Sequence, residues 1–430
     1  MAKLVHENSM IAAKSELDFF SVPPTQVSVK DGFWSIHYLD KAASNVGPYK
    51  FELPKDDYYY DFSKNYIQLK MKIVNSDGSS IDDTNNVGPI NLVGKTFFQR
   101  VILKIEGKEV FNSGSLYAYQ AYLESLLNYG WEAKNGQLQL GLFYKDSDFQ
   151  NLANNKGHAK RKARFAESAI VELFAPVHCH LFNTGRYMIR NCKVELELHR
   201  NPDKFLLMSS DAAAEYKIIV EDVAWHVWKV ELQESANLAI DEAMAKNTVK
   251  YPVRRVNLIN NEITARGQTV FINNLYTGDI PRRIILGLVR SSAFSGSYDK
   301  NPFEFLHYKL TAIEMRVGGK EVTPLKVDFV NKNYGMAYMH LLNGIGLETG
   351  DRGVWLDYDE FGEGNSLFVF DLTPDGVDSD ALELIKTGTV NVKLTFAENL
   401  NEPSGIELLS YAEFDGITEL DLNRQVHNDY

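Results

Sequence analysis

The feature that most constrains the fold is a series of motifs that occurs twice in the same order. The run Gly-Lys-Glu-Val is found at 107–110 and again at 319–322. By itself this identity means little, because roughly one such coincidence is expected in a chain of this length. The residues that follow each copy carry more weight. In both places a helical pattern ends in Leu-Leu-Asn, at 126–128 and 341–343, and is followed by a strand that ends in proline, at 171–176 and 369–374. An alternating strand comes next, at 193–198 and 391–396, and a last strand follows it, at 215–230 and 405–422. This collinearity indicates a duplicated fold.

The units that are duplicated consist mainly of strands. In "YIQLKMKIV" (66–74) the apolar residues Ile67, Leu69 and Ile73 fall on one face and polar residues on the other, which is the period of a half-buried strand. The same alternation is found at 192–200 and 390–396. Gly-, Asn-, Asp- and Pro-rich turns separate the segments. Further strands are expected at 27–39, 90–105, 169–176, 215–230, 268–273, 283–290, 311–318, 366–372 and 405–422.

Helical patterns are few. Apolar stripes predict helices at 116–128 and 329–342. A third helix is expected at 235–247, with Ser235 as its N-cap. This segment lies at the midpoint of the chain and is followed by "KYPVRRV", so we interpret it as the connector between the two halves.

Many short strands, few helices and about 200 residues in each half predict an all-β protein of two β-sandwiches. The commonest closed form of such a unit is the jelly roll, with two four-stranded sheets face to face. We therefore expect two tandem eight-stranded jelly rolls with a few short helices in their loops. The expected division is an N-terminal arm (1–25), a first jelly roll (26–232), a helical connector (233–250), a second jelly roll (251–426) and a C-terminal tail (427–430).

Composition and charge narrow the function. The net charge of −12 argues against a protein whose main role is to grip nucleic acid. Cys179 and Cys192 are too few for a disulfide scaffold and indicate a reducing compartment, although a single bridge between them stays open. The N-terminus lacks the apolar core of a signal peptide, and no window approaches the 18 apolar residues of a transmembrane helix.

Three segments resemble sites that bind ligands and depart from the required patterns. In "VGPINLVGKTFF" (87–98) the spacing from Gly88 to Gly94 is one residue too long for a phosphate-binding loop. The acidic stretch "DYDEFGEG" (357–364) has Phe361 where a calcium loop needs an oxygen ligand, so a solvated acidic loop is the better interpretation. The cluster "HCH" (178–180) would alternate in a strand, which separates its soft ligands. No cofactor or metal is expected.

Catalytic motifs are also lacking. The sequence has no Gly-x-Ser-x-Gly elbow, no His-Glu-x-x-His helix and no Cys-x-x-Cys pair. In a chain this large, their absence favours a structural role over an enzyme.

One concentrated basic run occurs at 156–165, "KGHAKRKARF". Because it lies where the first half is longer than the second, we expect an exposed excursion from the repeat. The simplest interpretation is a solvated surface loop. The functional alternatives are a nuclear-localisation signal, or a contact with packaged nucleic acid or an acidic partner. The candidate residues are Lys156, Lys160, Arg161, Lys162 and Arg164.

The order of the motifs also resembles a known family. Blocks such as "SELDFFSVPPTQVSV", "AYLESLLNYG", "LGLVRSSAFSGSYDKNPFEFLHY", "LFVFDLTPD" and "YAEFDGITELDLNRQV" are similar to the major capsid proteins of Polinton/Maverick-type elements and adintovirus-like DNA viruses. The resemblance runs from about residue 15 to the C-terminus, in order and nearly without gaps.

This resemblance implies a double jelly roll of the adenovirus-hexon lineage that is not an enzyme. It implies a homotrimer with six jelly rolls, which tiles an icosahedral shell around double-stranded DNA. Expected partners are further copies of the chain, penton or minor capsid proteins and, weakly and indirectly, the packaged DNA. The expected location is the virion, assembled in the host nucleus or cytoplasm.

Two other functions stay open from the residues alone. Tandem jelly rolls also occur in carbohydrate-binding modules, which usually show an exposed aromatic platform or a calcium site. An enzyme on a cupin-like or glycan-hydrolase sandwich would need a metal triad or paired carboxylates, with His178, His180 and His199 the first candidates.

Overall fold

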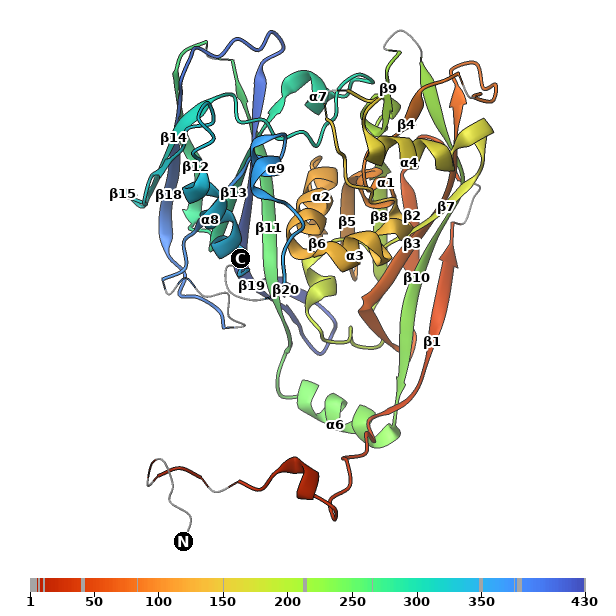
Figure 1. The fold of residues 1–430 in the computed structure, drawn as a ribbon. Helices are drawn as coiled ribbons and strands as arrows, with labels where there is room; N and C mark the ends of the chain where they lie inside the picture. Colours follow the sequence, from red (N-terminus) through yellow and green to blue (C-terminus); the bar gives the residue numbers. More distant parts are fainter. Residues whose placement is uncertain are drawn as a thin grey trace.

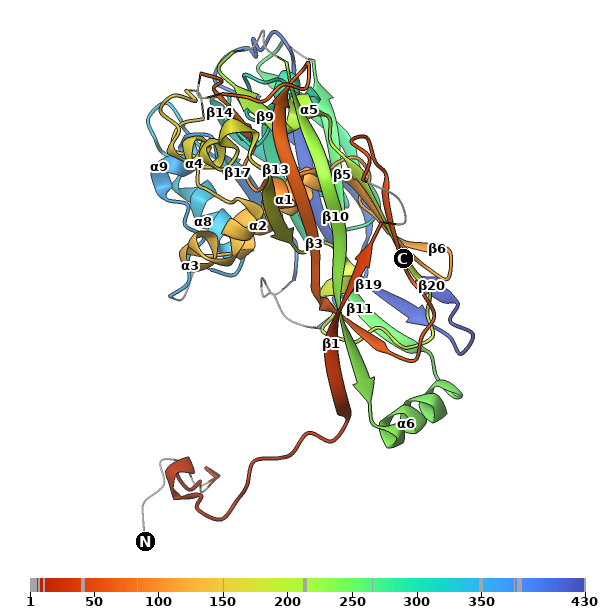
Figure 2. The same ribbon diagram turned by 90° about the vertical axis from the view of Figure 1, so that its right-hand side faces the viewer.

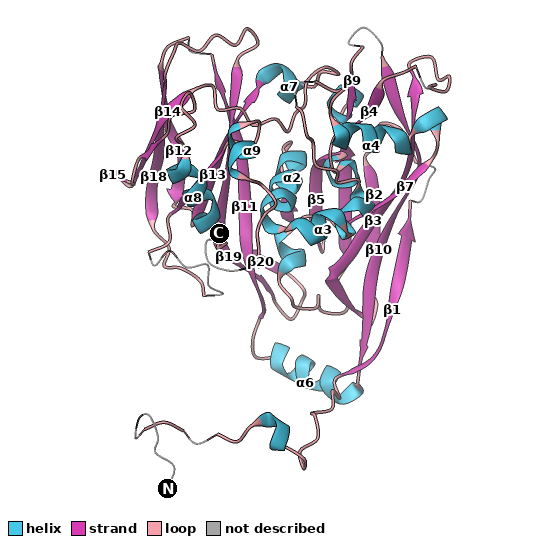
Figure 3. Ribbon diagram, in the orientation of Figure 1, coloured by secondary structure: helices cyan, strands magenta, loops and turns pink. Residues whose placement is uncertain are grey.

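The structure is a computed structural model that describes the chain except residues 1–5, 7, 11, 40–42, 83, 150, 212–214, 265, 348–350, 375, 377–380 and 429–430. The protein is an all-β double jelly roll, in which two β-sandwiches stand side by side (Figure 1) and short helices occupy the loops (Figure 3).

The first sandwich has two four-stranded antiparallel sheets. One sheet contains, in spatial order, β1 (Val29–Tyr38), β10 (Tyr216–Leu232), β3 (Tyr59–Asn75) and β7 (Val171–Ala175). The other contains β2 (Tyr49–Leu53), β8 (Val194–Arg200), β5 (Phe98–Ile105) and β6 (Lys108–Asn112). A short pair, β4 (Val87–Pro89) and β9 (Leu207–Ser209), lies outside these sheets.

The second sandwich repeats this arrangement. One sheet contains β11 (Val249–Ile263), β19 (Ile406–Leu420), β13 (Arg283–Arg290) and β17 (Leu367–Asp371), with β20 (Val426–Asn428) paired to β19. The other contains β12 (Thr269–Asp279), β18 (Thr387–Phe396), β14 (Leu310–Val317) and β15 (Lys320–Glu321), with β16 (Leu325–Lys326) paired to β14.

The two sandwiches have the same topology. Counted along each half, the eight main strands follow the order first, eighth, third and sixth in one sheet and second, seventh, fourth and fifth in the other. This order confirms the predicted duplication of a jelly roll.

The repeated Gly-Lys-Glu-Val marks the same hairpin in both halves. In the first half, Ile105 pairs with Lys108 across Glu106 (φ 51°) and Gly107 (φ 77°). In the second, Val317 pairs with Lys320 across two glycines at 318–319 (φ 56° and 81°). A two-residue turn with both central residues at positive φ is the type I′ turn that suits antiparallel strands, and glycine adopts it without strain. The motif is therefore a requirement of the turn.

The alternating segments form the expected half-buried strands. In β3, Ile67, Leu69, Met71 and Ile73 are buried while the residues between them are partly exposed. The long run 90–105 is a strand only from Phe98 onward, because a single helical turn, α1 (Val93–Thr96), precedes it. The expectation of a strand over 90–97 was wrong. All residues from 90 to 97 are buried, polar and apolar alike, so their pattern does not distinguish a strand from a buried helical turn.

The three expected helices form close to their expected positions, as α2 (Tyr117–Asn128), α6 (Glu234–Met244) and α8 (Gly335–Gly344), and a fourth longer helix, α4 (Lys156–Arg164), forms where a loop was expected. The shorter helical segments are η1 (Ser15–Leu17), α3 (Trp131–Asn135), η2 (Gln137–Gly141), η3 (Ala166–Ser168), η4 (His180–Asn183), α5 (Asp203–Leu206), α7 (Ser291–Ser295) and α9 (Tyr358–Gly362).

The predicted helix boundaries needed two corrections. Helix α6 begins at Glu234 with Gln233 as its N-cap and no side-chain capping bond, so Ser235 is not the cap. Helix α8 begins at Gly335 rather than at 329, because the residues before it form a turn in which Asp328 and Asn333 exchange backbone hydrogen bonds.

Candidate functional site

The contact between the two sandwiches brings together side chains that lie far apart in the sequence. Helix α2 lies there, between β5 of the first sandwich and β11 of the second (Figure 1). Tyr122 stacks on Phe303 with ring centroids 4.1 Å apart, and Tyr119 stacks on Phe294 at 5.7 Å. Such aromatic pairs stabilise a contact by about 0.5–1.5 kcal/mol beyond the area that they bury. An aromatic layer thus joins the two halves.

Burial on two sides distinguishes this contact from an ordinary sandwich surface. Every residue of α2 is buried except Glu124 and Asn128. Strand β19, which faces the helix, is buried without interruption from Ile406 to Phe414, although only alternate residues can point into its own sandwich. Both elements therefore pack on their own half with one face and on the other half with the opposite face.

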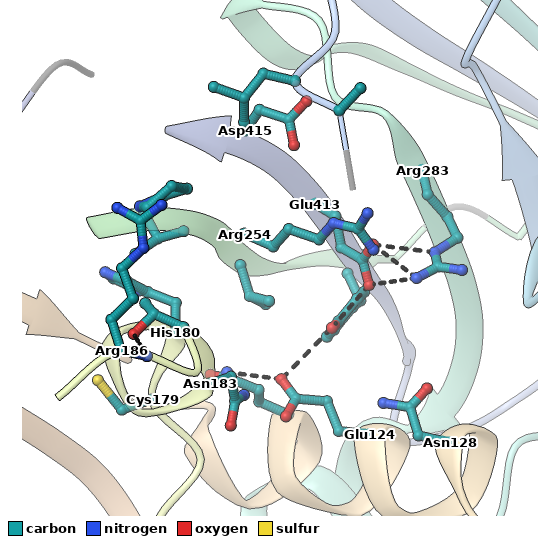
Figure 4. Close-up of a pocket in the computed structure, with 18 residues that line it drawn as sticks. Glu124, Asn128, Cys179, His180, Asn183, Arg186, Arg254, Arg283, Glu413 and Asp415 are labelled. Atoms are coloured by element: carbon teal, nitrogen blue, oxygen red, sulfur yellow. Dashed lines mark hydrogen bonds and ion pairs between the residues drawn. The ribbon is translucent and has the colours of Figure 1, made fainter. Parts of the chain in front are cut away.

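A chain of polar contacts crosses the same interface (Figure 4). The phenol oxygen of Tyr411 lies 3.1 Å from Glu413 Oε1 and 3.4 Å from Glu124 Oε1. Arg283 donates from Nη2 to both carboxylate oxygens of Glu413, at 2.8 and 2.7 Å. On the other side, His178 Nδ1 contacts Glu124 Oε2. A phenol has a single hydrogen, so it can donate to one of the two carboxylates at a time.

Burial sets the protonation of these groups. It lowers the pKa of His178, helped by the nearby Lys95 ammonium, so the imidazole is neutral and donates from Nδ1. Burial acts to raise the pKa of Glu124, but the contacts with His178 and Gln120 outweigh it and hold the pKa below the usual value. Burial raises the pKa of Tyr411 well above its usual value. The network is therefore an ionised carboxylate held by neutral donors, with Lys95 nearby.

A cavity of about 580 Å³ opens beside this network (Figure 4). Its walls come from α2 and η4 of the first sandwich and from β11, β13 and β19 of the second. They include Glu124, Asn183, Arg186, Arg254, Arg283, Glu413 and Asp415. Arg283 is committed to Glu413, and burial raises the pKa of the Cys179 thiol to about 12, so this thiol is not a ready nucleophile. The arrangement fixes two sheets relative to each other, and its groups do not form a nucleophile–base pair.

The predicted basic run is a helix instead of a loop, and it is only partly exposed. Asn155 caps α4 by accepting from the backbone N–H of His158 at 3.0 Å. Lys156, Lys160 and Arg164 are exposed and Lys162 is half-buried. These four residues remain candidates for an external contact.

Arg161 is the exception, and its expected exposure was wrong. Its side chain is fully buried and ion-paired with the buried Asp146, from Nη2 to Oδ1 at 2.8 Å. It also donates from Nε to the carbonyl of Pro89 at 2.9 Å and from Nη1 to that of Tyr144 at 2.8 Å. The guanidinium holds three segments of the first half together, so its role is structural.

The other predicted motifs are absorbed into the fold. His178 and His180 are buried, and Cys179 and Cys192 are buried free thiols. Across the described residues, no group of three or more His, Cys, Asp or Glu is arranged to hold a metal ion. The acidic stretch at 357–364 is not a loop but helix α9, where Asp357 and Glu360 form a capping box around the buried Phe361.

The Glu124 network was not predicted from the sequence. A signal was present, because Glu124 is the one carboxylate in the otherwise apolar pattern of 117–128. A carboxylate with only 11% of its side chain exposed needs a partner. Its partners could not be inferred, since Tyr411 and Glu413 lie almost 300 residues away in the sequence.

Exposed apolar residues gather at the N-terminus. Leu17, Phe19, Phe20 and Val22 have large exposed fractions, up to 95% for Phe20. This segment leaves the body of the molecule below β1 (Figure 2). Within the described part of the chain, no helix has the length and apolar character needed to cross a membrane.

Comparison with solved structures places this fold among viral capsid chains. A chain in the structure of the Sputnik virophage superposes with a TM-score of 0.66 at 12% identity, covering 99% of this chain and 94% of that one. A chain of the PBCV-1 virus capsid gives 0.59 at 9% identity, with 96% and 99% covered. The mavirus major capsid protein gives 0.56 at 10% identity, with 100% and 97% covered. At these identities the comparison establishes the shared double jelly-roll fold.

Sequence comparison adds a relative of unknown function. An uncharacterised protein of Caenorhabditis elegans is 26% identical over 422 residues, which is 94% of this chain and 98% of the relative. No family model matches the chain.

Proposed function

We propose that this chain is a major capsid protein. Three copies form a pseudo-hexameric capsomer, and the capsomers tile an icosahedral shell around double-stranded DNA. The observation that carries the proposal is the presence, in one chain, of two sandwiches with the same strand order. Their full-length likeness to capsid chains supports it.

The duplication suits this role for a geometric reason. A hexagonal tile made of three identical chains needs two similar but non-identical units in each chain. Two jelly rolls of one topology supply the six units, and the closed symmetry of a trimer supplies the arrangement. We take residues 26–232 and 251–426 as these units, with 233–250 as their connector.

The finer features of the proposal follow from the resemblance in sequence. The chain is encoded by a Polinton/Maverick-type element or an adintovirus-like virus, and acts in the virion as a structural protein without enzymatic activity. Penton and minor capsid proteins complete its shell, which is assembled in the host nucleus or cytoplasm. The four accessible cations of α4 serve as a nuclear-localisation signal or touch DNA weakly.

The N-terminal arm has a place in the same scheme. Its exposed phenylalanines, Phe19 and Phe20, are costly to leave in water. We assign the arm to a contact under the shell or on a neighbouring capsomer. Deleting residues 1–25 should leave the thermal unfolding temperature of the body unchanged and prevent growth beyond the trimer.

The test of the proposal is the molar mass of the purified chain in solution. Light scattering coupled to size exclusion should give about three times 48.8 kDa at micromolar concentration. A particle at the mass of a single chain would contradict the proposal.

A further inference from the structure

The two halves of the chain differ in how much of their equivalent surfaces is covered. Helix α2 and strand β19 are buried on both faces, because each packs against the other half. Their counterparts by chain order are α8 in the second half and β10 in the first. Within the part of one chain that the structure describes, the outer faces of α8 and β10 do not pack against the other half.

Helix α8 shows the missing cover clearly. It buries Ala337, Leu341 and Gly344 against its own sandwich. Its other side carries Met336 and Met339, whose exposed fractions are 38% and 46%. Methionine is a flexible apolar residue that suits a contact surface between proteins.

The counterpart sheet shows the same asymmetry. In β10, Trp225 and Val227 are fully buried in the core, whereas His226 and Trp228 on the opposite face are only partly buried. Figure 2 shows this sheet, with β1, β3 and β10, at the surface of the molecule.

The outer side of this sheet carries a cluster of aromatic and apolar side chains, interrupted by the hydrogen-bonded pair His226 and Gln68, which we call the aromatic face. Trp34 of β1 packs against Trp228 with ring centroids 5.3 Å apart and against Tyr66 at 5.9 Å. Trp34 is 44% exposed and Tyr38 is 62% exposed. The aromatic face consists of Trp34, Ile36, Tyr38, Tyr66, Phe174 and Trp228.

We infer that the aromatic face of one copy is covered by helix α8 of a second copy, in the way that α2 covers the β19 sheet within the chain. The inference rests on the proposed function and adds the surfaces through which the trimer closes. Inside a chain, α2 of the first half packs against β19 of the second half. The reverse pair, α8 of the second half and β10 of the first half, remains uncovered on each chain. Their residues are of the type that partner surfaces bury: tryptophan, tyrosine and methionine.

Such a contact is heterologous, since each copy contributes α8 to one neighbour and the aromatic face to another. A heterologous contact closes into a ring when the rotation between copies allows it. A heterologous contact also predicts that two variants, each defective in a different one of the two surfaces, can still bind each other through their intact surfaces.

Two single substitutions test the contact, one on each surface. Trp34→Arg places a charge in the aromatic face and Met339→Arg places one on α8. Leu238→Arg is the matched control, because Leu238 is 60% exposed on α6, away from both surfaces. We expect each test variant to weaken association by at least about thirtyfold, the effect of losing one central contact residue. The control should remain a trimer, as should the conservative variant Met339→Leu.

Mixing the two test variants separates the inference from a general loss of folding. The Trp34→Arg copy retains an intact α8, and the Met339→Arg copy retains an intact aromatic face. Their mixture should form a dimer by light scattering, whereas each variant alone should be a monomer with an unchanged far-UV circular dichroism spectrum. Misfolded copies could not complement one another in this way.

The possible outcomes are distinct. If wild-type protein is a trimer and both variants remain trimers, the assigned surfaces are wrong and the proposed function stands. If the variants dissociate but their mixture stays monomeric, the head-to-tail pairing is wrong. If the wild-type chain is itself a monomer, the proposed function fails and the assigned contact fails with it.

Discussion

Replacing Arg161 by alanine should lower the free energy of unfolding by about 3–5 kcal/mol, which is the usual cost of removing one partner from a buried ion pair. Arg161 is fully buried in α4 and donates to Asp146, to the carbonyl of Pro89 and to that of Tyr144.

The magnitude follows from what the substitution leaves behind. Hydrogen bonds to charged groups contribute about 1.5–3 kcal/mol each, and three are lost. Among the residues that the structure describes, Asp146 would remain buried with one long contact, 3.3 Å, from Asn301 Nδ2. Part of this cost would be relieved by rearrangement of the loops, so we expect the total to lie well below the sum of the three bonds.

The measurement is urea-induced unfolding of the full chain followed by tryptophan fluorescence. Lys156→Ala is the control, since Lys156 lies exposed in the first turn of the same helix, and it should change stability by less than about 0.5 kcal/mol. A loss of under about 1 kcal/mol for Arg161→Ala would refute the structural role assigned to this residue.

Three further predictions concern the interior. Tyr411→Phe should destabilise the chain by about 1–3 kcal/mol in the same urea assay, because Glu124 and Glu413 lose a shared neighbour; an unchanged midpoint would count against the network. Burial lowers the pKa of His158 from 6.5 to about 4, so between these values the unfolded state binds a proton that the folded state does not. The contribution of this residue should therefore lower the free energy of unfolding by up to about 3 kcal/mol as the pH drops from 6.5 to 4. In His158→Asn, the urea midpoint should fall less steeply over that pH range than in the wild type. Both cysteine thiols should resist Ellman's reagent in the native protein and react after unfolding; rapid native labelling would show that they are accessible.

Local rules were sufficient to predict most of the fold. Alternation located β3, β8 and β18, and the twin Gly-Lys-Glu-Val runs located equivalent hairpins, because a type I′ turn restricts which residues it accepts. The failures occurred where local patterns are ambiguous. At 90–97 every residue is buried, the polar Asn91, Lys95 and Thr96 included, so the pattern of apolar residues does not distinguish a strand from a helical turn.

The site was harder to predict because its parts come from distant segments. The basic run was identified correctly as a cluster of cations, but sequence alone could not show that Arg161 turns inward to Asp146. The aromatic face was missed for a related reason. Trp34 and Trp228 lie at opposite ends of the first half and become neighbours only through the pairing of β1 with β10.

Electron microscopy of the purified full-length chain can decide whether the chain forms the proposed capsomer. We expect three-fold particles with a pseudo-hexagonal outline and six sandwich-sized lobes, two from each copy. Featureless single-chain particles, or particles with two-fold symmetry, would contradict it.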